Sequence, residues 1–381
     1  MLSIAIFSEC YHPMRNGVVV SVASFARRLA ELGHTVTIFT ARHPDLRGAE
    51  EGIFRFPSIT FPTRARYPIA LPLATGAARR ALDEMSFDVI HSNAPMIMGR
   101  VALAHARRRG VPLVFTYHTL IEEYTHYIPL PRPLVRSSAV WASRSYSNRV
   151  DHIITPSEYA ASRLREYGVT RPIAVIPTGI DLEIVDSMQP ADIREQYGIP
   201  AGVPLLAYAG RLAREKNIPR VLGAFRRVLA AEPDAHLLLI GGGAFDRGIA
   251  ALAKEMGIAH RTRVTGLVDR AVVMQCLRAA DLFVFASQTE TQGLVIGEAM
   301  ACGTAVVAVA SHAAREIITD GREGLLVEDA DAPFADAILS LLHTPDKREE
   351  IGRRARLRAE TLSVPQCTDR LLDVYNKVIK G

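Results

Sequence analysis

The sequence predicts two α/β domains, in which helices connect the strands of parallel sheets. The chain has 381 residues, more than one hydrophobic core normally serves, because a domain holds roughly 100–200 residues. Short apolar runs alternate with amphipathic stretches, a pattern typical of parallel strands joined by right-handed helical crossovers. A stretch rich in Pro, Gly and polar residues at 189–204 interrupts this pattern and indicates a linker. We therefore expect two Rossmann-like domains.

The first domain is expected to span residues 1–188. Its predicted strands and helices are, in chain order, 4–7, 20–32, 35–40, 88–91, 98–109, 113–117, 151–155, 158–167 and 173–177. Gly33 can cap the helix that precedes it. Ser157 can cap the start of the helix that follows it.

The second domain is expected to span residues 189–363. Its predicted strands are 205–209, 236–240, 263–265, 282–286, 305–309 and 324–327, each flanked by a helical pattern. The remaining residues, 364–381, are expected to form a helix that can return to the first domain.

Several classes of protein and site are not expected from this chain. The apolar start lacks a basic segment and a long apolar core, so it predicts a buried strand and no signal peptide. No uncharged apolar stretch reaches the length of about 18 residues that a membrane span needs. The four cysteines have neither paired nor zinc-like spacing, and they suit a reducing cytoplasm. We expect a cytoplasmic protein whose membrane contact, if any, is peripheral on the inner face.

Basic residues are concentrated in the first part of the chain. Residues 1–171 contain 21 Arg, no Lys and 13 acidic residues, a net charge of +8, whereas the rest has 24 basic and 27 acidic residues, a net charge of −3. Such a charge suits a lipid head-group surface, a phosphorylated substrate or nucleic acid, or it is simply a soluble Arg-rich surface. Interleaved aromatic residues for stacking on bases are missing, so we expect no nucleic-acid partner.

The strongest motif, residues 287–303, directly follows a strand of the second domain. It places one carboxylate in a loop, at Glu290, and another on the following helix, at Glu298. Gly293 and Leu294 lie where that helix should begin, so its free N–H groups and the positive end of its dipole can bind a phosphate. Ligands normally bind at the carboxyl ends of strands in such sheets. The alternative is that both carboxylates are ordinary solvated residues.

A second motif, residues 210–217, follows the first strand of the second domain and contains Arg211 and Lys216. These cations could neutralise a departing diphosphate, in which case no metal is required. The glycine run at 241–243 allows close backbone approach to a ligand but lacks the spacing of a dinucleotide-binding fingerprint, which disfavours a dehydrogenase. Residues 329–331 (Asp-Ala-Asp) resemble a metal-binding motif, but we expect a surface turn there and no metal site.

Two residues of the first domain are expected to face the cleft between the domains. Gly17 belongs to a glycine turn after the first strand, and His118 follows the strand 113–117. A single histidine is more often structural than catalytic, so His118 alone carries little weight.

Together these residues resemble the retaining glycosyltransferase family four, whose GT-B fold has two Rossmann-like domains facing a cleft. The matching motifs are Asn16-Gly17-Val18, His118-Thr119-Leu120, Pro177-Thr178-Gly179-Ile180-Asp181, Gly210-Arg211 with Lys216, and the pair Glu290 and Glu298. The resemblance implies a metal-independent hexosyltransferase that uses a nucleotide-sugar donor, without a cofactor.

The resemblance also implies roles for single residues. The implied donor ligands are Arg211 and Lys216 at the diphosphate, the amides of Gly293 and Leu294 at the phosphate, Glu298 at the ribose and Val268 beside the base. Glu290 would hold the hydroxyls of the donor sugar, and His118 and Gly17 would lie at the sugar and phosphate from the first domain. His118 and Glu290 are the expected catalytic residues. No residue is placed by its spacing as a covalent nucleophile, which favours front-side displacement with the departing phosphate as base.

Within that family, residues 122–129 and 289–295 are most similar to glycolipid synthases that glucosylate diacylglycerol, with UDP-glucose as the implied donor. Arginines beside apolar side chains suit an anionic interface, where each basic residue contributes about 1 kcal/mol. The residues expected to face the acceptor or membrane are Arg64, Arg66, Arg132, Arg136 and Trp141. An internal packing helix would explain the same pattern.

Two other functions are compatible with the same motifs. One is a transferase that uses GDP-mannose or another donor on a phosphoinositide, polyprenyl or saccharide acceptor. Another is a protein that binds a nucleotide sugar without catalysis.

Overall fold

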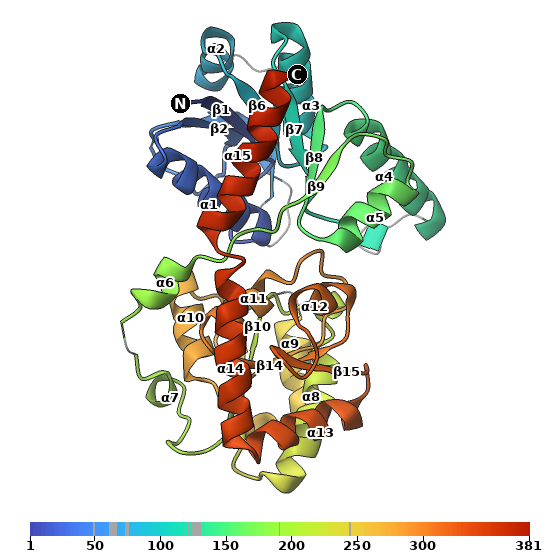
Figure 1. Cartoon of the computed structure of the whole chain (residues 1–381). Helices are drawn as coiled ribbons and strands as arrows, with labels where there is room; N and C mark the ends of the chain where they lie inside the picture. Colours follow the sequence, from blue (N-terminus) through green and yellow to red (C-terminus); the bar gives the residue numbers. More distant parts are fainter. Residues whose placement is uncertain are drawn as a thin grey trace. The chain divides into compact units, whose positions relative to one another are not determined.

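The chain forms two compact units in a computed structural model (Figure 1). The structure describes residues 1–381 except 49, 61–66, 73–75, 121, 124–130, 190 and 244. The first unit comprises Met1–Gly179 and Val364–Gly381, and the second comprises Ile180–Ser363. No helix in the described part of the chain is both long and apolar enough to cross a bilayer.

The first unit is built on a parallel sheet with the strand order β3-β2-β1-β6-β7-β8-β9. The strands are β1 (Ser3–Phe7), β2 (Thr35–Ala41), β3 (Ile53–Phe56), β6 (Val89–Ser92), β7 (Leu113–Thr116), β8 (His152–Thr155) and β9 (Ile173–Val175). The antiparallel pair β4 (Ser58–Thr60) and β5 (Pro68–Ala70) lies beside it. The strand order reverses between β1 and β6, which is the switch point of this sheet.

Helices cover both faces of the first sheet because side chains of a strand alternate between faces. Ile4 and Ile6 of β1 share one apolar cluster with α1 (Gly17–Glu31) and α15 (Val364–Lys380). Ala5 and Phe7 point into the other cluster, with α2 (Ala77–Glu84) and α3 (Ile97–Arg109). The remaining helices of this unit are α4 (Arg132–Ser147) and α5 (Glu158–Glu166).

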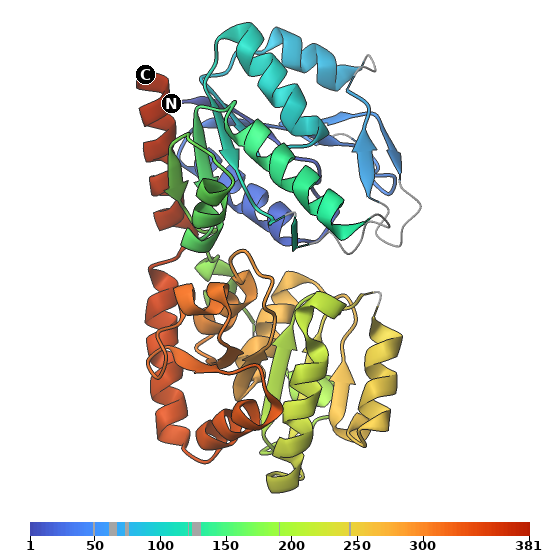
Figure 2. The same ribbon diagram turned by 90° about the vertical axis from the view of Figure 1, so that its right-hand side faces the viewer.

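The C-terminal helix α15 belongs to the first unit, where it lies along the sheet beside α1 (Figures 1 and 2). Its Leu371 and Tyr375 are fully buried there. The hydroxyl of Tyr375 lies 2.6 Å from Nδ1 of His91, and Nε2 of the same ring lies 2.6 Å from Oγ1 of Thr116. His91 therefore joins the last helix of the chain to β6 and β7.

The second unit contains another parallel sheet, with the strand order β12-β11-β10-β13-β14-β15. Its strands are β10 (Leu205–Ala209), β11 (His236–Ile240), β12 (Thr262–Val264), β13 (Leu282–Phe285), β14 (Ala305–Val309) and β15 (Gly324–Val327). Its helices are α6 (Leu182–Asp186), α7 (Ile193–Gln196), α8 (Ile218–Ala231), α9 (Asp246–Glu255), α10 (Arg270–Ala279), α11 (Leu294–Ala301), α12 (His312–Ile317), α13 (Asp331–Leu342) and α14 (Pro345–Glu360), with single turns at Arg214–Lys216 and Ala259–Arg261. The order of this sheet reverses between β10 and β13.

The division between the units follows Gly179, whereas the sequence placed it after residue 188. Ile180 and Val185 belong to the core of the second unit, and α6 packs on α10 of that unit. The stretch 189–204 also differs from the predicted linker, because it contains α7, whose Ile193 is buried in the same core. The composition of such a stretch is polar overall and so predicts a linker. One buried apolar residue is enough to make it part of a domain.

Local signals placed the helix ends correctly in two cases. Oγ of Ser157 accepts a hydrogen bond from the amide of Ala160 at 3.2 Å, as expected of a cap. Gly33 follows the end of α1 with a φ of +85°, which suits glycine. By contrast, α1 begins at Gly17 and not at residue 20, because Oδ1 of Asn16 caps the amide of Val19 at 3.0 Å.

Candidate active site

The densest group of predicted site residues lies at the switch point of the second sheet. Arg211 and Lys216 follow β10, and Glu290 follows the neighbouring strand β13. The ammonium of Lys216 lies 2.5 Å from Oε1 of Glu290, with side chains only 12% and 18% exposed. The structure thus brings together a cation and a carboxylate that are 74 residues apart in the chain.

Arg211 presents a cation at the surface of the same site. Its side chain is 54% exposed, and Nη2 lies 2.7 Å from Oε1 of Glu215, a carboxylate that is only 3% exposed. Guanidinium carries five N–H donors, so this one ion pair leaves donors for an anionic ligand.

The helix α11 begins at Leu294, as the sequence predicted. Gly293 precedes it with a φ of +74°, a left-handed conformation that favours glycine. The first amides of a helix have no partner within the helix, and they carry the positive end of its dipole. A phosphate oxygen is a suitable ligand for this end of α11.

Glu298 lies further along α11 and is buried. Nε and Nη2 of Arg270, at the start of α10, approach its Oε1 at 3.1 and 2.9 Å. Burial raises the pKa of Glu298, and the charge of Arg270 partly offsets this effect. Arg270 could not be predicted from the sequence, because no local pattern connects it with a carboxylate on another helix.

The glycines after β11 allow the loop after β11 to lie very close to the loop after β10. A Cβ on Gly241 would lie 2.1 Å from the carbonyl oxygen of Gly210, and one on Gly243 would lie 2.4 Å from that of Leu212. The run was predicted to allow close approach of a ligand, and the structure shows that it also allows close approach of the loop that carries Arg211. Val268, predicted beside the base, is half-buried and packs against the core of this unit.

The carboxylates of Asp329 and Asp331 are engaged by side chains of the second unit. Arg220 binds both of them. Asp329 also accepts hydrogen bonds from Asn217 and Gln288. Within the part of the chain that is described, no group of His, Cys, Asp and Glu side chains has the arrangement of a metal site.

In the first unit, His118 follows β7 and is hydrogen-bonded to a residue that follows the adjacent strand β6. Nε2 of His118 lies 2.8 Å from Oδ1 of Asn93. Burial lowers the pKa of His118 to about 4, so the ring is neutral at neutral pH. Because a carbonyl oxygen only accepts, Nε2 carries the proton and Nδ1 is left as an acceptor. Asn93 was not predicted from the sequence, because it belongs to none of the motifs.

Gly17 begins α1, the helix that follows β1. It is exposed, and a Cβ added there would meet no protein atom within 4 Å. Strands β1, β6 and β7 are parallel neighbours, so the start of α1 and the residues after β6 and β7 lie at one edge of the first sheet. The structure therefore places Gly17, Asn93 and His118 at this edge.

Some of the residues predicted to face the acceptor or membrane are exposed, and others are not described by the structure. Arg64 and Arg66 lie outside the described residues, and Arg132 begins α4 without a described side chain. Arg136 is exposed on α4, and the same helix carries Trp141 and Leu134, which are 67% and 66% exposed. Another face of α4 packs internally, with Val135 buried and Val140 half-buried. Internal packing therefore explains part of the pattern but not Leu134 and Trp141.

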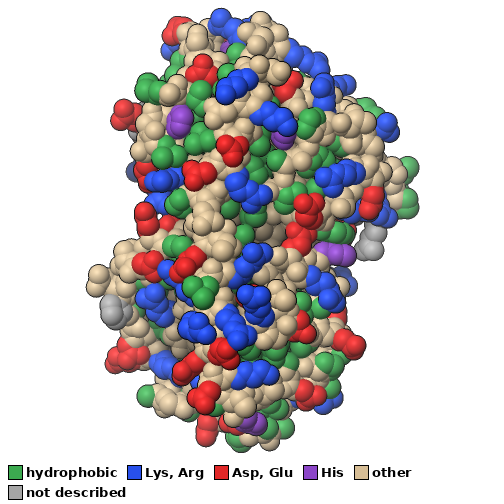
Figure 3. Space-filling view, in the orientation of Figure 1, with side chains coloured by type: hydrophobic (Ala, Val, Ile, Leu, Met, Phe, Trp, Pro, Cys, Tyr) green, Lys and Arg blue, Asp and Glu red, His purple; other side chains and the backbone are tan. Residues whose placement is uncertain are grey.

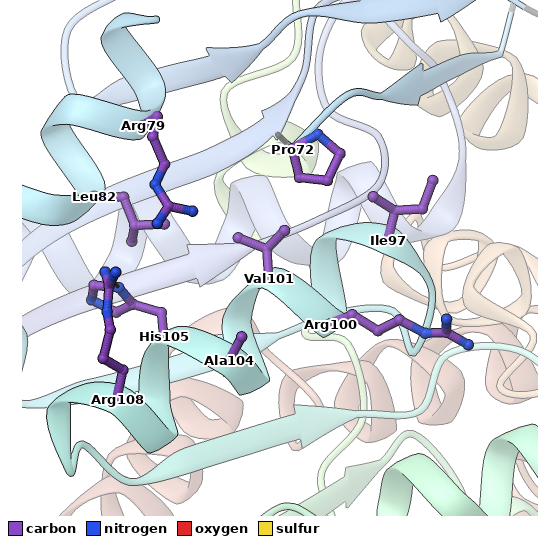
Figure 4. A pocket seen from close by; sticks show the side chains of 9 residues that line it. All are labelled: Pro72, Arg79, Leu82, Ile97, Arg100, Val101, Ala104, His105 and Arg108. Atoms are coloured by element: carbon purple, nitrogen blue, oxygen red, sulfur yellow. Dashed lines mark hydrogen bonds between the residues drawn. The ribbon is translucent and has the colours of Figure 1, made fainter. Parts of the chain in front are cut away.

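Charges of both signs are interspersed on the face of the molecule shown in Figure 3. The surplus of arginine in the first part of the chain therefore does not form a patch of one sign on this face. The first unit also has a cavity of about 460 Å³ between α2 and α3, which the sequence did not predict (Figure 4). Its lining is Pro72, Arg79, Leu82, Ile97, Arg100, Val101, Ala104, His105 and Arg108.

Comparisons with known proteins agree with this architecture. Residues 15–184 match the model of Glycosyltransferase Family 4, and residues 190–358 match that of Glycosyl transferases group 1. An alpha-monoglucosyldiacylglycerol synthase of Streptococcus pneumoniae is 32% identical over 355 residues, covering 91% of this chain and 80% of the relative. The chain belongs to glycosyltransferase family 4. It is therefore a hexosyltransferase.

Another relative and two solved structures extend this comparison. A GDP-mannose-dependent alpha-mannosyltransferase of Mycobacterium tuberculosis is 29% identical, covering 98% of this glycosyltransferase and 96% of the relative. Among solved structures, a sucrose-phosphate synthase from Thermosynechococcus elongatus has a TM-score of 0.80 at 23% identity over 100% of both chains. HepE from Anabaena, in complex with UDP and glucose, has a TM-score of 0.80 at 18% identity, covering 99% and 100%. The two-domain α/β fold with parallel sheets is thus that of GT-B glycosyltransferases.

Proposed function

We propose that this glycosyltransferase moves glucose from UDP-glucose to the hydroxyl of a diacylglycerol-type lipid, with retention of the anomeric configuration. The observation that carries the proposal is the Lys216–Glu290 pair at the switch point of the second sheet, beside Arg211 and the start of α11. Cations, a helix N-terminus and a carboxylate at one strand edge suit a sugar linked to a diphosphate.

In this proposal the second unit binds the donor. An ammonium has three N–H donors, so Lys216 can hold Glu290 and a phosphate oxygen together. Arg211 and the first amides of α11 bind the remaining phosphate oxygens, and Glu298 accepts a ribose hydroxyl through Oε2, since Arg270 contacts its Oε1. Val268 flanks the base.

The same residues support a reaction that needs no metal. The bond between the anomeric carbon and the phosphate oxygen breaks, and the diphosphate leaves with both electrons of that bond. The acceptor hydroxyl oxygen bonds to the carbon on the same face, and its proton passes to the departing phosphate. Arg211 and Lys216 stabilise the charge that develops on the leaving group, an effect that commonly supplies several kcal/mol. Glu290 orients the hydroxyls of the donor sugar.

His118 is proposed to contact the donor sugar as a neutral hydrogen-bonding group. Its low pKa prevents it from adding a positive charge beside the anomeric carbon, where positive charge develops in the transition state. The hydrogen bond to Asn93 occupies Nε2 of the ring. Nδ1 is then available to accept a hydrogen bond from a sugar hydroxyl. Gly17 leaves space for a ligand, because no protein atom lies within 4 Å of the position that a Cβ would take.

The lipid acceptor is supported by surface features of the first unit. Leu134 and Trp141 are apolar and exposed on α4, two helical turns apart, and Arg136 is exposed on the same helix. Exposed apolar side chains together with arginine on one helix are typical of interfacial helices. The cavity between α2 and α3 has mainly aliphatic walls with three arginines, a combination that suits an acyl chain. Two of the relatives carry the name alpha-monoglucosyldiacylglycerol synthase.

The test is release of nucleoside diphosphate from a panel of UDP- and GDP-sugars, with and without diacylglycerol in anionic vesicles. We expect UDP release from UDP-glucose that requires the lipid, and a glycolipid product with the α configuration of the donor. Glu290→Gln, which keeps the size of the side chain, is the matched inactive variant. Inversion at the anomeric carbon, or lipid-independent transfer to a soluble sugar, would contradict the proposal.

A second candidate is transfer of mannose from GDP-mannose. It is favoured by the relatives named GDP-mannose-dependent alpha-mannosyltransferases, which match nearly the full chain. In the same panel this candidate predicts GDP release from GDP-mannose and none from UDP-glucose.

A further inference from the structure

A network of side chains links the two loops that carry Lys216 and Glu290. Its centre is Asp329, in the loop after β15. Oδ1 of Asp329 accepts hydrogen bonds from Nδ2 of Asn217 at 3.1 Å and Nε of Arg220 at 2.7 Å, and Oδ2 accepts one from Nε2 of Gln288 at 2.5 Å.

Both loop residues in this network are close in the chain to the pair. Asn217 is the neighbour of Lys216, and Gln288 lies two residues before Glu290. One carboxylate therefore connects the loop after β10 with the loop after β13, from a third loop that contributes nothing to the pair itself.

The backbone at Asn217 has a left-handed conformation that its side chain helps to hold. Among the described residues, Asn217 is the one non-glycine residue with a positive φ, at +53°. Its conformation ends the turn Arg214–Lys216 and starts α8, and it is less favourable for a residue with a side chain than for glycine. Hydrogen bonds from its side-chain amide to Asp329 and to the carbonyl of Ala286, at 3.4 Å, hold it there.

We propose that Asp329 is a positioning residue that holds the Lys216 ammonium and the Glu290 carboxylate together before the donor binds. The inference rests on the proposed donor role of that pair. Asp329 itself does not contact the donor in this proposal. Preorganised groups are effective because they need not be rearranged during the reaction, so loosening the two loops lowers turnover more than it lowers stability.

Asp331 is the matched control within the same cluster. It also binds Arg220, and it lies against α8, where a Cβ on Gly223 would come within 2.4 Å of its carboxylate. No contact with Asn217 or Gln288 is described for it. Asp331→Asn therefore disturbs the same arginine without disturbing the links to the two loops.

The replacement Asp329→Asn is nearly isosteric, but it removes the negative charge opposite Arg220 and sets an amide nitrogen, which only donates, against the donating Nε2 of Gln288. We expect kcat for UDP-glucose to fall about tenfold, which is a barrier change of about 1.4 kcal/mol. KM should change less than threefold. The melting temperature should not fall below that of Asp331→Asn. Adding Gln288→Glu returns one negative charge to the network beside Arg220 and should recover most of kcat.

A second measurement does not depend on activity. Because Lys216 is held against Glu290, its ammonium should react slowly with an acylating reagent, as followed by peptide mass spectrometry. We expect Asp329→Asn to raise the labelling rate of Lys216 severalfold and Asp331→Asn to leave it unchanged, with Lys254 on α9 as an internal reference.

Equal labelling of Lys216 in the two variants would overturn the inference, whether or not the protein turns over UDP-glucose. Equal kcat values in the two variants would also overturn it, as would failure of Gln288→Glu to rescue. If labelling responds as expected but no hexose donor is turned over, then the proposed function fails and the positioning role stands.

Discussion

Removal of Arg270 should separate the structural role of the Arg270–Glu298 pair from its proposed role in donor binding. In Arg270→Met the side chain keeps its apolar length but loses its charge, and Glu298 is left buried and unpaired. Breaking a fully buried pair from one side costs about 3–5 kcal/mol. Arg270 is 25% exposed and Glu298 11% exposed, so solvent screening should reduce the loss to about 2–3 kcal/mol.

The loss should depend on pH in a defined direction. Burial already raises the pKa of Glu298, and Arg270 lowers it, so Arg270→Met raises this pKa further. A carboxyl with a raised pKa in the folded state binds more protons when folded than when unfolded, so stability decreases as pH rises through the interval between the two pKa values. The variant should therefore be closer to wild type near pH 5 than at pH 7.

The assay is urea unfolding followed by far-UV circular dichroism at both pH values. Fluorescence is unsuitable for this unit, because the single tryptophan, Trp141, lies in the first unit. The double variant Arg270→Met/Glu298→Leu replaces the pair by apolar side chains and should recover most of the stability. It should not recover UDP binding, because the proposed ribose ligand is gone.

Two results would refute this reasoning. One is a single variant that loses less than about 0.5 kcal/mol, the usual effect of a surface substitution. The other is a double variant that binds UDP as tightly as wild type.

Further predictions concern both units. Lys216→Ala should weaken UDP binding about tenfold to a hundredfold, the loss of a charge-assisted contact of about 1.5–3 kcal/mol, and isothermal titration with Lys254→Ala as control measures it. Burial lowers the pKa of His118 to about 4, so the unfolded state takes up a proton that the folded state does not. Stability should therefore decrease as pH falls from about 6.5 to 4, and His118→Gln should flatten that decrease in acid-unfolding curves. Trp141 emission should shift to the blue with anionic vesicles and return with salt, and an unchanged spectrum would argue against membrane contact by α4. Val101→Trp, which fills the cavity between α2 and α3, should lower transfer to long-chain diacylglycerol but not to a short-chain analogue, and equal effects on both would exclude an acyl-chain site there.

The amino-acid sequence by itself predicted all strands of the second sheet, all strands of the first sheet except β3, and the loops that carry the proposed site residues. The start of α11 at Leu294 and the cap at Ser157 follow from short-range signals, because a helix end depends on residues within one turn. The alternation of apolar runs determined the parallel sheets in the same way. Since ligand-binding loops follow the carboxyl ends of such strands, Arg211 and Glu290 could be placed at one edge before any tertiary structure was known.

Only the tertiary structure decided which distant side chains meet. The pairing of Arg270 with Glu298, of Asn93 with His118, and of Asp329 with two loops joins residues from different elements. The place of α15 in the first unit has the same origin, because an amphipathic helix shows that it needs an apolar partner but not which sheet provides it. The sequence pattern records whether a side chain should be buried, whereas its partners depend on how whole elements pack.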